Sequence, residues 1–196
     1  MVQDEDSTAL RNTSSESIDN LVQEASAGND NAFITLWKIF YPKILNYLRR
    51  FTRNAEDLCS EVWIRIAGSI RGFTGNGSAF QAWIFTIARN LAIDDARANK
   101  RRGSTVELRD EDWIASESSA VEITDLLDRL PIDQAEIILL RVVIGFSVEE
   151  VAKITGKTVS NVKVLSHRGL NKLKLELETS GYRGRGGAHG TFTVAD

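Results

Sequence analysis

The chain has 196 residues and a mass of 21.8 kDa, of which 42% are hydrophobic and 26% charged, the composition of a folded protein rather than a disordered one. Its single cysteine, Cys59, excludes an internal disulfide framework, and its two histidines give no zinc-ligand spacing. The longest apolar run, 137–140, stops at Arg141, well short of the ~20 residues that a membrane span needs. The acidic N-terminus lacks a signal pattern, so we expect a cytoplasmic protein with no metal, cofactor or membrane insertion.

The net charge of −3 hides an alternation of charge along the chain. Residues 1–30 carry a net charge of −6, residues 31–102 of +7, residues 103–128 of −7, residues 129–178 of +2 and residues 179–196 of +1. Two basic blocks separated by an acidic one predict two folded units that bind a polyanion, joined by a segment that does not bind it.

Apolar residues recur with helical spacing through both basic blocks, and no stretch shows a sustained period of two. The expected helices are 17–27, 31–52, 55–70 and 78–102 in the first block, and 121–130, 132–144, 148–155 and 158–178 in the second. Capping-box patterns at Ser78-x-x-Gln81 and Ser147-x-x-Glu150 predict two helix starts. Pro42 is expected to bend or break its helix.

The fold class that follows is all-α, with two small helical domains. An N-terminal helical bundle spans 17–102, and a C-terminal helix-turn-helix domain spans 121–178. An acidic flexible linker, 103–120, joins them, and the polar N-terminus (1–16) and Gly-rich tail (179–196) are expected to be disordered.

The second block contains a helix-turn-helix pattern, in which the turn at Gly156-Lys157 joins a short capped helix to a longer one. The inward stripe of the last helix is expected at Val162, Ser166, Leu170, Leu173 and Leu177. The opposite stripe consists of Ser160, Asn161, Lys163, Val164, His167, Arg168 and Asn171. Such polar and cationic groups suit base edges and phosphates, but any solvated helix has a polar outer face, so both interpretations stay open.

The long helix of the first block combines aromatic residues with basic ones. Phe73, Phe80 and Trp83 lie in the preceding loop and the first turns, and the helix end carries Arg89, Arg97, Lys100, Arg101 and Arg102. Aromatic side chains beside a basic track can hold unstacked bases of a single strand. The same residues could be core aromatics and bases that complement the helix dipole.

Residues 55–66 place Asp57, Glu61 and Arg65 at four-residue spacing on one helix face. A carboxylate metal site would need a histidine partner, which this segment lacks. Internal ion pairs and a docking face for a basic partner explain the spacing equally well. Cys59 is most simply a small buried hydrophobic residue, and His167 has no nearby carboxylate or cysteine to make it a catalyst.

Several segments follow one another in an order typical of one protein family. They are 21–33, 55–61 (AEDLCSE), 82–94 (AWIFTIARNLAID), Leu130-Pro131, 145–152 (GFSVEEVA) and 162–168 (VKVLSHR). Together they resemble the extracytoplasmic-function (ECF) sigma factors, the two-domain initiation factors of bacterial RNA polymerase. The resemblance covers the chain from about Leu21 to Leu177.

The resemblance implies a role for each segment. Contact with the polymerase clamp is implied for Asp57, Leu58, Glu61, Val62 and Arg65. Contact with the −10 element, including capture of an unpaired base by the loop 71–78, is implied for Arg71, Phe73, Asn76, Ser78, Arg89, Asn90, Asp94, Arg97 and Arg101. Reading of the −35 element is implied for Ser160, Asn161, Lys163, Val164, His167 and Arg168. The implied partners are core RNA polymerase (the clamp of β′ and the flap of β), promoter DNA and an anti-sigma factor, with no catalytic residue.

The chain departs from the family pattern at three positions. A glutamine is usual where Ser60 stands, an arginine is common where Leu165 stands, and an apolar residue is common where Ser166 stands.

One alternative function is that of a stand-alone helix-turn-helix regulator, which would need a dimer interface and palindromic sites and would leave the first block without a role. An enzyme of the helical-bundle type is more distant, because no nucleophile, base and orienting group come together.

Overall fold

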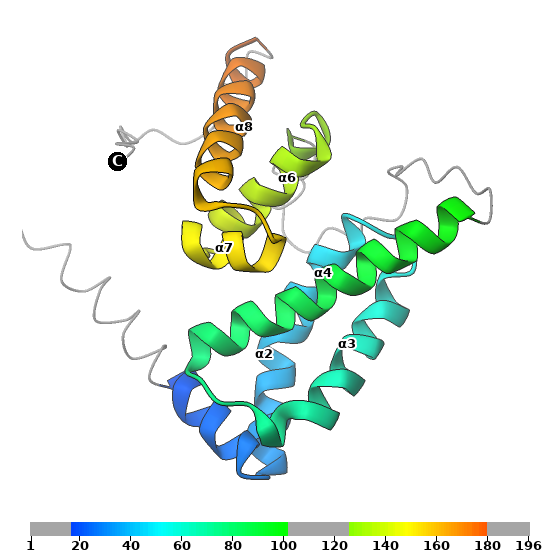
Figure 1. Cartoon of the computed structure of the whole chain (residues 1–196), viewed down its shortest axis with the longest axis vertical. Coiled ribbons are helices and arrows are strands. Elements are labelled where there is room, and N and C mark those ends of the chain that lie inside the picture. The colour runs from blue at the N-terminus through cyan, green and yellow to red at the C-terminus, as the bar shows by residue number, and fades with distance from the viewer. Residues whose placement is uncertain (1–16, 102–125, 180–196) are drawn as a thin grey trace, which may run out of the picture.

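The computed structural model describes residues 17–101 and 126–179 (Figure 1). Every regular element in these two ranges is helical, which confirms the all-α prediction. No helix in these ranges is long and apolar enough to cross a membrane. The predicted linker (103–120), the N-terminus (1–16) and residues 180–196 of the tail lie outside the described residues.

The first block forms a bundle of four helices. A helix at 17–26 is followed by α2 (Asp30–Arg49), α3 (Ala55–Ser69), a 3-10 turn η1 (Ile70–Gly72) and α4 (Gly77–Arg101). Asn29 caps α2, because its side chain accepts hydrogen bonds from the backbone N–H groups of Asn31 and Ala32. The expected helix boundaries here lie within three residues of the observed ones.

Pro42 was expected to bend or break its helix, and it does not break it, because α2 continues through this residue. Phe40 and Ile44 on either side of Pro42 are both fully buried. Their packing against the bundle holds this part of the chain helical and offsets the hydrogen bond that proline cannot donate.

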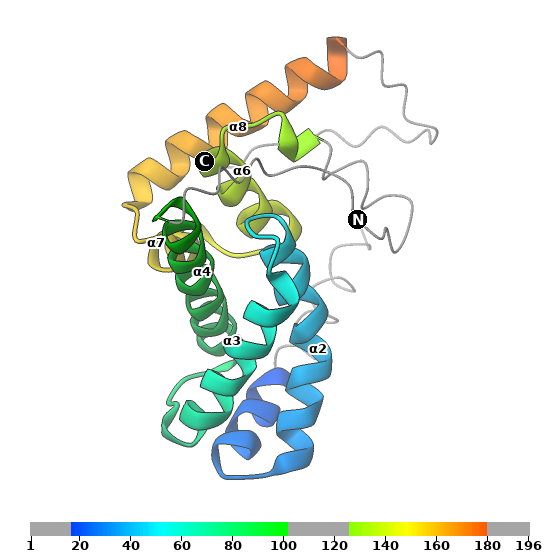
Figure 2. The ribbon, with the colours of Figure 1, turned by 90° about the vertical axis from the view of Figure 1, so that its right-hand side faces the viewer.

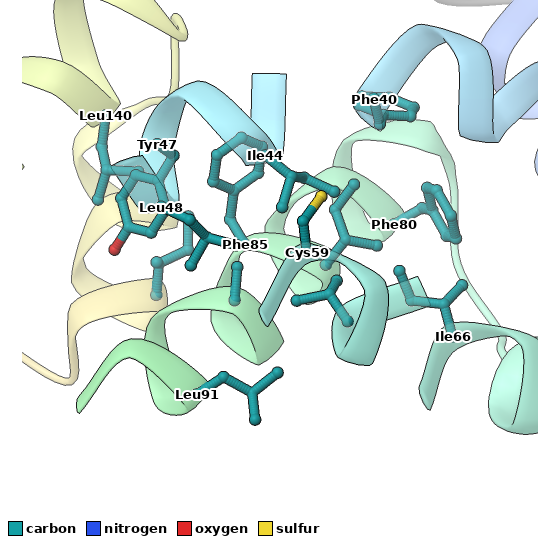
Figure 3. Close-up of a cluster of buried hydrophobic side chains, with 14 of the residues drawn as sticks. Phe40, Ile44, Tyr47, Leu48, Cys59, Ile66, Phe80, Phe85, Leu91 and Leu140 are labelled. Atoms are coloured by element: carbon teal, nitrogen blue, oxygen red, sulfur yellow. The ribbon is translucent and has the colours of Figure 1, made fainter. Parts of the chain in front are cut away.

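The core of the bundle lies between α2, α3 and α4 (Figure 3). Its fully buried members include Leu36, Phe40, Ile44, Leu48, Cys59, Val62, Ile66, Phe80, Ile84, Phe85 and Ala88. The rings of Phe40 and Phe80 meet edge to face, with centroids 5.8 Å apart. The buried positions in each helix recur every three or four residues, as the sequence pattern predicts.

In the second block residues 126–128 are helical, and residues 121–125 of the helix expected at 121–130 lie outside the described residues. Next comes α6 (Ile132–Ile138), which continues as a π-helical segment η2 (Leu139–Val143). The helix expected at 132–144 is thus present with a widened second half. Next come α7 (Val148–Thr155) and α8 (Val159–Thr179). The capping box of Ser147 and Glu150 is confirmed, and Gly156 ends α7 with a left-handed φ of 67°.

The inward stripe of α8 differs in part from the expected one. Val162 and Ser166 are buried as expected, but Leu170 is 39% exposed. The close approach of α6 falls on Gly169, where a methyl group would lie 3.0 Å from Ile138 Cγ1. The stripe therefore passes through Gly169, and Leu170 points outward.

The two domains pack against each other, with α7 lying along α4 (Figures 1 and 2). Phe85 of α4 meets Phe146, which precedes α7, edge to face at 5.3 Å between ring centroids. Leu140 of η2 joins the same buried cluster as Tyr47 of α2 (Figure 3). The hydrophobic core is therefore continuous across the two domains.

Two helical glycines give a matched test of this packing. The N–H of Gly77 donates to Asp19 Oδ1 at 2.5 Å, and a methyl group on Gly77 would lie 2.5 Å from Ile18 Cγ2. Gly77→Ala should therefore lower the free energy of unfolding by roughly 1–3 kcal/mol through overpacking. Gly68 in α3 has nothing within 4 Å of the same position, so Gly68→Ala should raise it by up to about 1 kcal/mol. Urea unfolding measures both changes, and equal effects would contradict the close contact at Gly77.

Candidate nucleic-acid and polymerase interfaces

The outer face of α8 carries the residues expected to read DNA. Ser160, Asn161, Lys163, Val164, His167 and Arg168 are all exposed. The helix begins after Thr158, whose hydroxyl accepts a hydrogen bond from the N–H of Asn161. A ring nitrogen of His167 lies 3.3 Å from Nδ2 of Asn171, one turn further along the same face. The face therefore presents hydrogen-bonding groups and two cations, as a major-groove helix would.

The opposite side of α8 is held by a polar contact. Ser166, at a position where the family pattern has an apolar residue, is 2% exposed, and its hydroxyl accepts a hydrogen bond from Arg141 Nη1 at 3.0 Å. A buried hydroxyl without a partner would be costly, so this bond allows serine at a core position. The bond holds α8 in a fixed orientation against η2. The sequence pattern did not indicate this contact.

A stacked aromatic pair joins the loop before α4 to the first turns of the helix. Phe73 is half-buried, and its ring stacks on that of Trp83 with centroids 5.0 Å apart and planes inclined at 26°. Phe80 meets both rings but is itself fully buried, so it is a core residue. Arg71 and Asn76 are exposed beside the stack. The loop thus presents one aromatic platform together with polar side chains.

The capping box expected at Ser78-x-x-Gln81 is wrong. The α4 helix begins one residue earlier, and Asn76 caps it by accepting a hydrogen bond from the N–H of Ala79 at 2.9 Å. The hydroxyl of Ser78 is thereby released from the backbone and donates instead to Glu150 of α7.

The second half of α4 presents an exposed polar face made by Asn90, Asp94, Arg97 and Arg101. Arg97 forms a surface ion pair with Asp94 at 3.4 Å. The neighbouring Asp95 has a different role, since it accepts hydrogen bonds from Thr52 Oγ1 at 2.6 Å and Asn54 Nδ2 at 3.0 Å. Asp95 therefore anchors α4 to the loop between α2 and α3, a role that sequence analysis missed.

Arg89 lies outside this exposed face, contrary to the expectation that it is presented to DNA. Its side chain is 17% exposed, and it donates to the buried Glu136 of α6 through Nε at 2.8 Å and Nη2 at 3.3 Å. Tyr47 donates its hydroxyl to the same carboxylate at 2.9 Å. Burial, followed by the negative charge of Glu136, raises the pKa of Tyr47 well above its usual value. All three groups are held in the contact between the domains.

The exposed face of α3 carries Asp57, Glu61 and Arg65, with Glu61 accepting from Arg65 Nε at 3.0 Å. Leu58 is half-buried at its edge. Val62 is fully buried, so the expectation that its side chain meets a partner is wrong; the four-residue spacing that it shares with Ile66 places it in the core.

This α3 face has one apolar member that was not expected from the sequence. Ile64 is 67% exposed and lies three residues after Glu61, on the same side of the helix. The signal was present in the sequence, because Ile64 falls outside the four-residue core spacing of Val62 and Ile66.

Cys59 is confirmed as a small buried hydrophobic residue, with Sγ 4.0 Å from the carbonyl oxygen of Tyr41. Burial, with a further contribution from the charge of Glu56, raises the pKa of its thiol to about 12. A thiol with this pKa is not a nucleophile near neutral pH. Among residues 17–101 and 126–179, no three His, Cys, Asp or Glu side chains cluster as metal ligands.

Comparison with known proteins identifies both domains. The family model for Sigma-70 region 2 matches residues 36–102, and that for Sigma-70, region 4 matches residues 120–173. The ECF RNA polymerase sigma factor SigD of Mycobacterium tuberculosis is 33% identical over 183 residues, which cover 85% of this chain and 86% of SigD. The chain belongs to the ECF RNA polymerase sigma factors. It is therefore a transcription initiation factor that works with core RNA polymerase on promoter DNA, as predicted, and the stand-alone regulator is not favoured.

Two solved structures share the fold. The sigma factor RpoE of Bartonella quintana, crystallised with the anti-sigma factor NepR, superposes with a TM-score of 0.61 at 24% identity, covering 74% of this chain and 96% of RpoE. CnrH, in complex with the cytosolic domain of CnrY, gives a TM-score of 0.58 at 22% identity, covering 83% of this chain and 98% of CnrH.

Proposed function

We propose that this ECF sigma factor directs core RNA polymerase to specific promoters and helps to melt the −10 region. It acts by binding alone, in the cytoplasm, and performs no covalent chemistry. Residues 17–102 act as region 2, residues 103–120 as the linker and residues 121–178 as region 4. The observation that carries the proposal is the presence of one exposed polar face on each helical domain, together with the stack of Phe73 in the loop 71–78 on Trp83 of α4.

Region 4 reads the −35 element through the outer face of α8. The side chains of Lys163 and Arg168 point away from the domain core and can bind phosphates or guanine edges. Ser160, Asn161, Val164 and His167 lie on the same exposed side and complete the contact surface. The hydrogen bond from Arg141 to Ser166 sets the angle at which this face meets the groove.

Region 2 acts at the −10 element. The stack of Phe73 on Trp83 offers an unpaired base an aromatic surface that is already in place, so little ordering is needed on binding. Arg71, Asn76 and Ser78 flank it from the loop. Asn90, Asp94, Arg97 and Arg101 then follow the strand along α4.

The face of α3 binds the β′ clamp of the polymerase. Asp57 and Glu61 supply carboxylates, and Ile64 supplies exposed apolar area between the charges. Arg65 and Leu58 border this surface, whereas Val62 supports it from the core. An apolar centre ringed by charged groups is typical of specific protein interfaces. Region 4 contacts the β flap.

An anti-sigma factor is a further proposed partner. RpoE of B. quintana, which shares this fold, is seen bound to the anti-sigma factor NepR. Exposed apolar residues on both domains, such as Ile64 on α3 and Val142 on η2, give a wrapping partner area to bury.

The proposal is tested by transcription reconstituted with core polymerase and a set of promoters. The isolated protein should bind promoter duplex weakly, because its net charge is −3 and its recognition surface is short. With core polymerase it should start transcripts at defined positions. Tight, sequence-specific duplex binding in the absence of polymerase, with no transcript in its presence, would overturn the proposal.

Substitutions on α3 test the clamp contact. Asp57→Lys and Glu61→Lys should weaken binding to core polymerase at least tenfold. Each replaces a carboxylate of the α3 face by a positive charge, which would repel a basic partner. Unfolding by urea should change little. Glu24→Lys, in the helix 17–26, is the matched control, since it makes the same charge change at another exposed position of region 2. Unchanged polymerase affinity in both α3 variants would place the interface elsewhere.

Substitutions on the polar faces of α8 and α4 should impair different steps of transcription initiation. Arg168→Ala should weaken the −35 contact by roughly 1–3 kcal/mol if Arg168 reads a base through two hydrogen bonds, and the loss should appear mainly on promoters with the preferred −35 sequence. Asn90→Ala, Asp94→Ala and Arg97→Ala should leave closed-complex binding largely intact and impair strand opening.

A promoter that is pre-melted at the −10 element separates the two classes. It should rescue transcription by the α4 variants and not by Arg168→Ala. Rescue of both classes, or of neither, would show that the assignment of the two helices to promoter elements is wrong.

A further inference from the structure

An apolar side chain lies at the centre of the polar face of α8. Val164 is 46% exposed. Residues three and four positions away are its nearest neighbours on the helix surface. Here they are Ser160, Asn161, His167 and Arg168, and all four are polar and exposed. Val164 is therefore an apolar spot surrounded by hydrogen-bonding and cationic groups.

The anchoring of α8 directs Val164 outward. Val162 and Ser166 are 0% and 2% exposed and fix the inner side of the helix, the latter through its hydrogen bond with Arg141. Two residues turn an α-helix by about 200°, so Val164 points almost directly away from both. It therefore lies in the middle of the surface that α8 offers to a ligand.

The stability of the helix does not explain a valine at this position. A β-branched side chain loses rotamer freedom in a helix, and alanine, lysine or glutamate would form the helix better. In the free protein the isopropyl group of Val164 also stays largely in contact with water. A contact made in a complex, where this group would be buried, explains it better.

The side chains of the face differ in length in a way that suits a groove. Ser160 and Val164, one turn apart, are short, whereas Lys163 and Arg168 beside and beyond them are long and cationic. Short side chains contact base edges only when the helix backbone comes close to them, and long cationic ones can then reach the phosphates. The first turns of α8 therefore match the floor and the walls of the major groove.

The base pairs present a single kind of apolar group in the major groove, the C5-methyl group of thymine. We infer that Val164 contacts the methyl group of a thymine in the −35 element and thereby selects a T·A pair at that position. The inference rests on the proposed function, in which α8 enters the groove at this element. Arg168 follows Val164 by one turn, a rise of about 6 Å. The base pair that Arg168 contacts therefore lies within about two pairs of this thymine.

Base analogues that differ by one methyl group test the contact. Holoenzyme assembled from the full-length chain and core polymerase first selects its preferred −35 sequence from promoters randomised there. Each T·A pair of that sequence is then replaced in turn by U·A, 5-methylcytosine·G and cytosine·G. At one position, T·A should bind about fourfold more tightly than U·A, and 5-methylcytosine·G about fourfold more tightly than cytosine·G. This is the effect expected from removing about one methyl group from water.

Substitutions at Val164 should change these two ratios. Val164→Ser removes both methyl groups and should bring the ratios close to one, whereas Val164→Thr keeps one methyl group and should give intermediate ratios. Serine and valine have similar helix propensities, so α8 should stay folded, which urea unfolding checks. Val159→Ser is the matched control, since it makes the same change at a valine that is 39% exposed and about 140° round the helix. It should keep both ratios near fourfold.

Several results would overturn the inference. They are ratios that stay near fourfold in Val164→Ser, and a preferred −35 sequence in which no thymine methyl group affects binding. Weaker binding of Val164→Ser to core polymerase, with both ratios unchanged, would show that Val164 contacts a protein instead. In each case transcription from defined start sites would leave the proposed function intact. A holoenzyme with no −35 preference at all would overturn both.

Discussion

The hydrogen bonds and ion pair at Glu136 join two domains that the chain separates by a long acidic segment. The carboxylate lies in the contact between α6, α2 and α4, where it is 7% exposed and accepts hydrogen bonds from Tyr47 and Arg89. An unpaired buried charge would cost several kcal/mol. The donors of Tyr47 and Arg89 therefore have to stay within hydrogen-bond distance of Glu136. The neighbouring elements are consequently placed by it: α6 beside the end of α2, and α7 along α4.

The α4 helix carries three functions at once. One side packs on α2 and α3 through Phe80 and Ile84, and another meets region 4 through Phe85. The exposed side of its second half carries Asn90, Asp94, Arg97 and Arg101, and the loop before the helix is exposed as well. This division explains why α4 is apolar around so much of its circumference in its first half and polar only toward its end.

Local interactions explain why so much of the fold could be predicted. The capping box of Ser147 and Glu150, the turn at Gly156 and the shared face of Asp57, Glu61 and Arg65 on α3 involve residues close in sequence, and all of them were found where expected. The family resemblance rested on the same short segments and was confirmed by the two Sigma-70 family models. The polar face of α8 could be located because its alternation with Val162 and Ser166 is also local.

Most of the errors came from contacts between residues far apart in the chain. Pro42 stays helical because Phe40 and Ile44 are packed by other helices, and Leu170 turns outward because α6 approaches α8 at Gly169. Ser78 and Arg89 are engaged by carboxylates 72 and 47 residues away. The sequence by itself determined the helices, their apolar faces and the family. Only the tertiary structure decided which polar side chains stay exposed, because the cost of burying a charge depends on a partner that no local pattern can name.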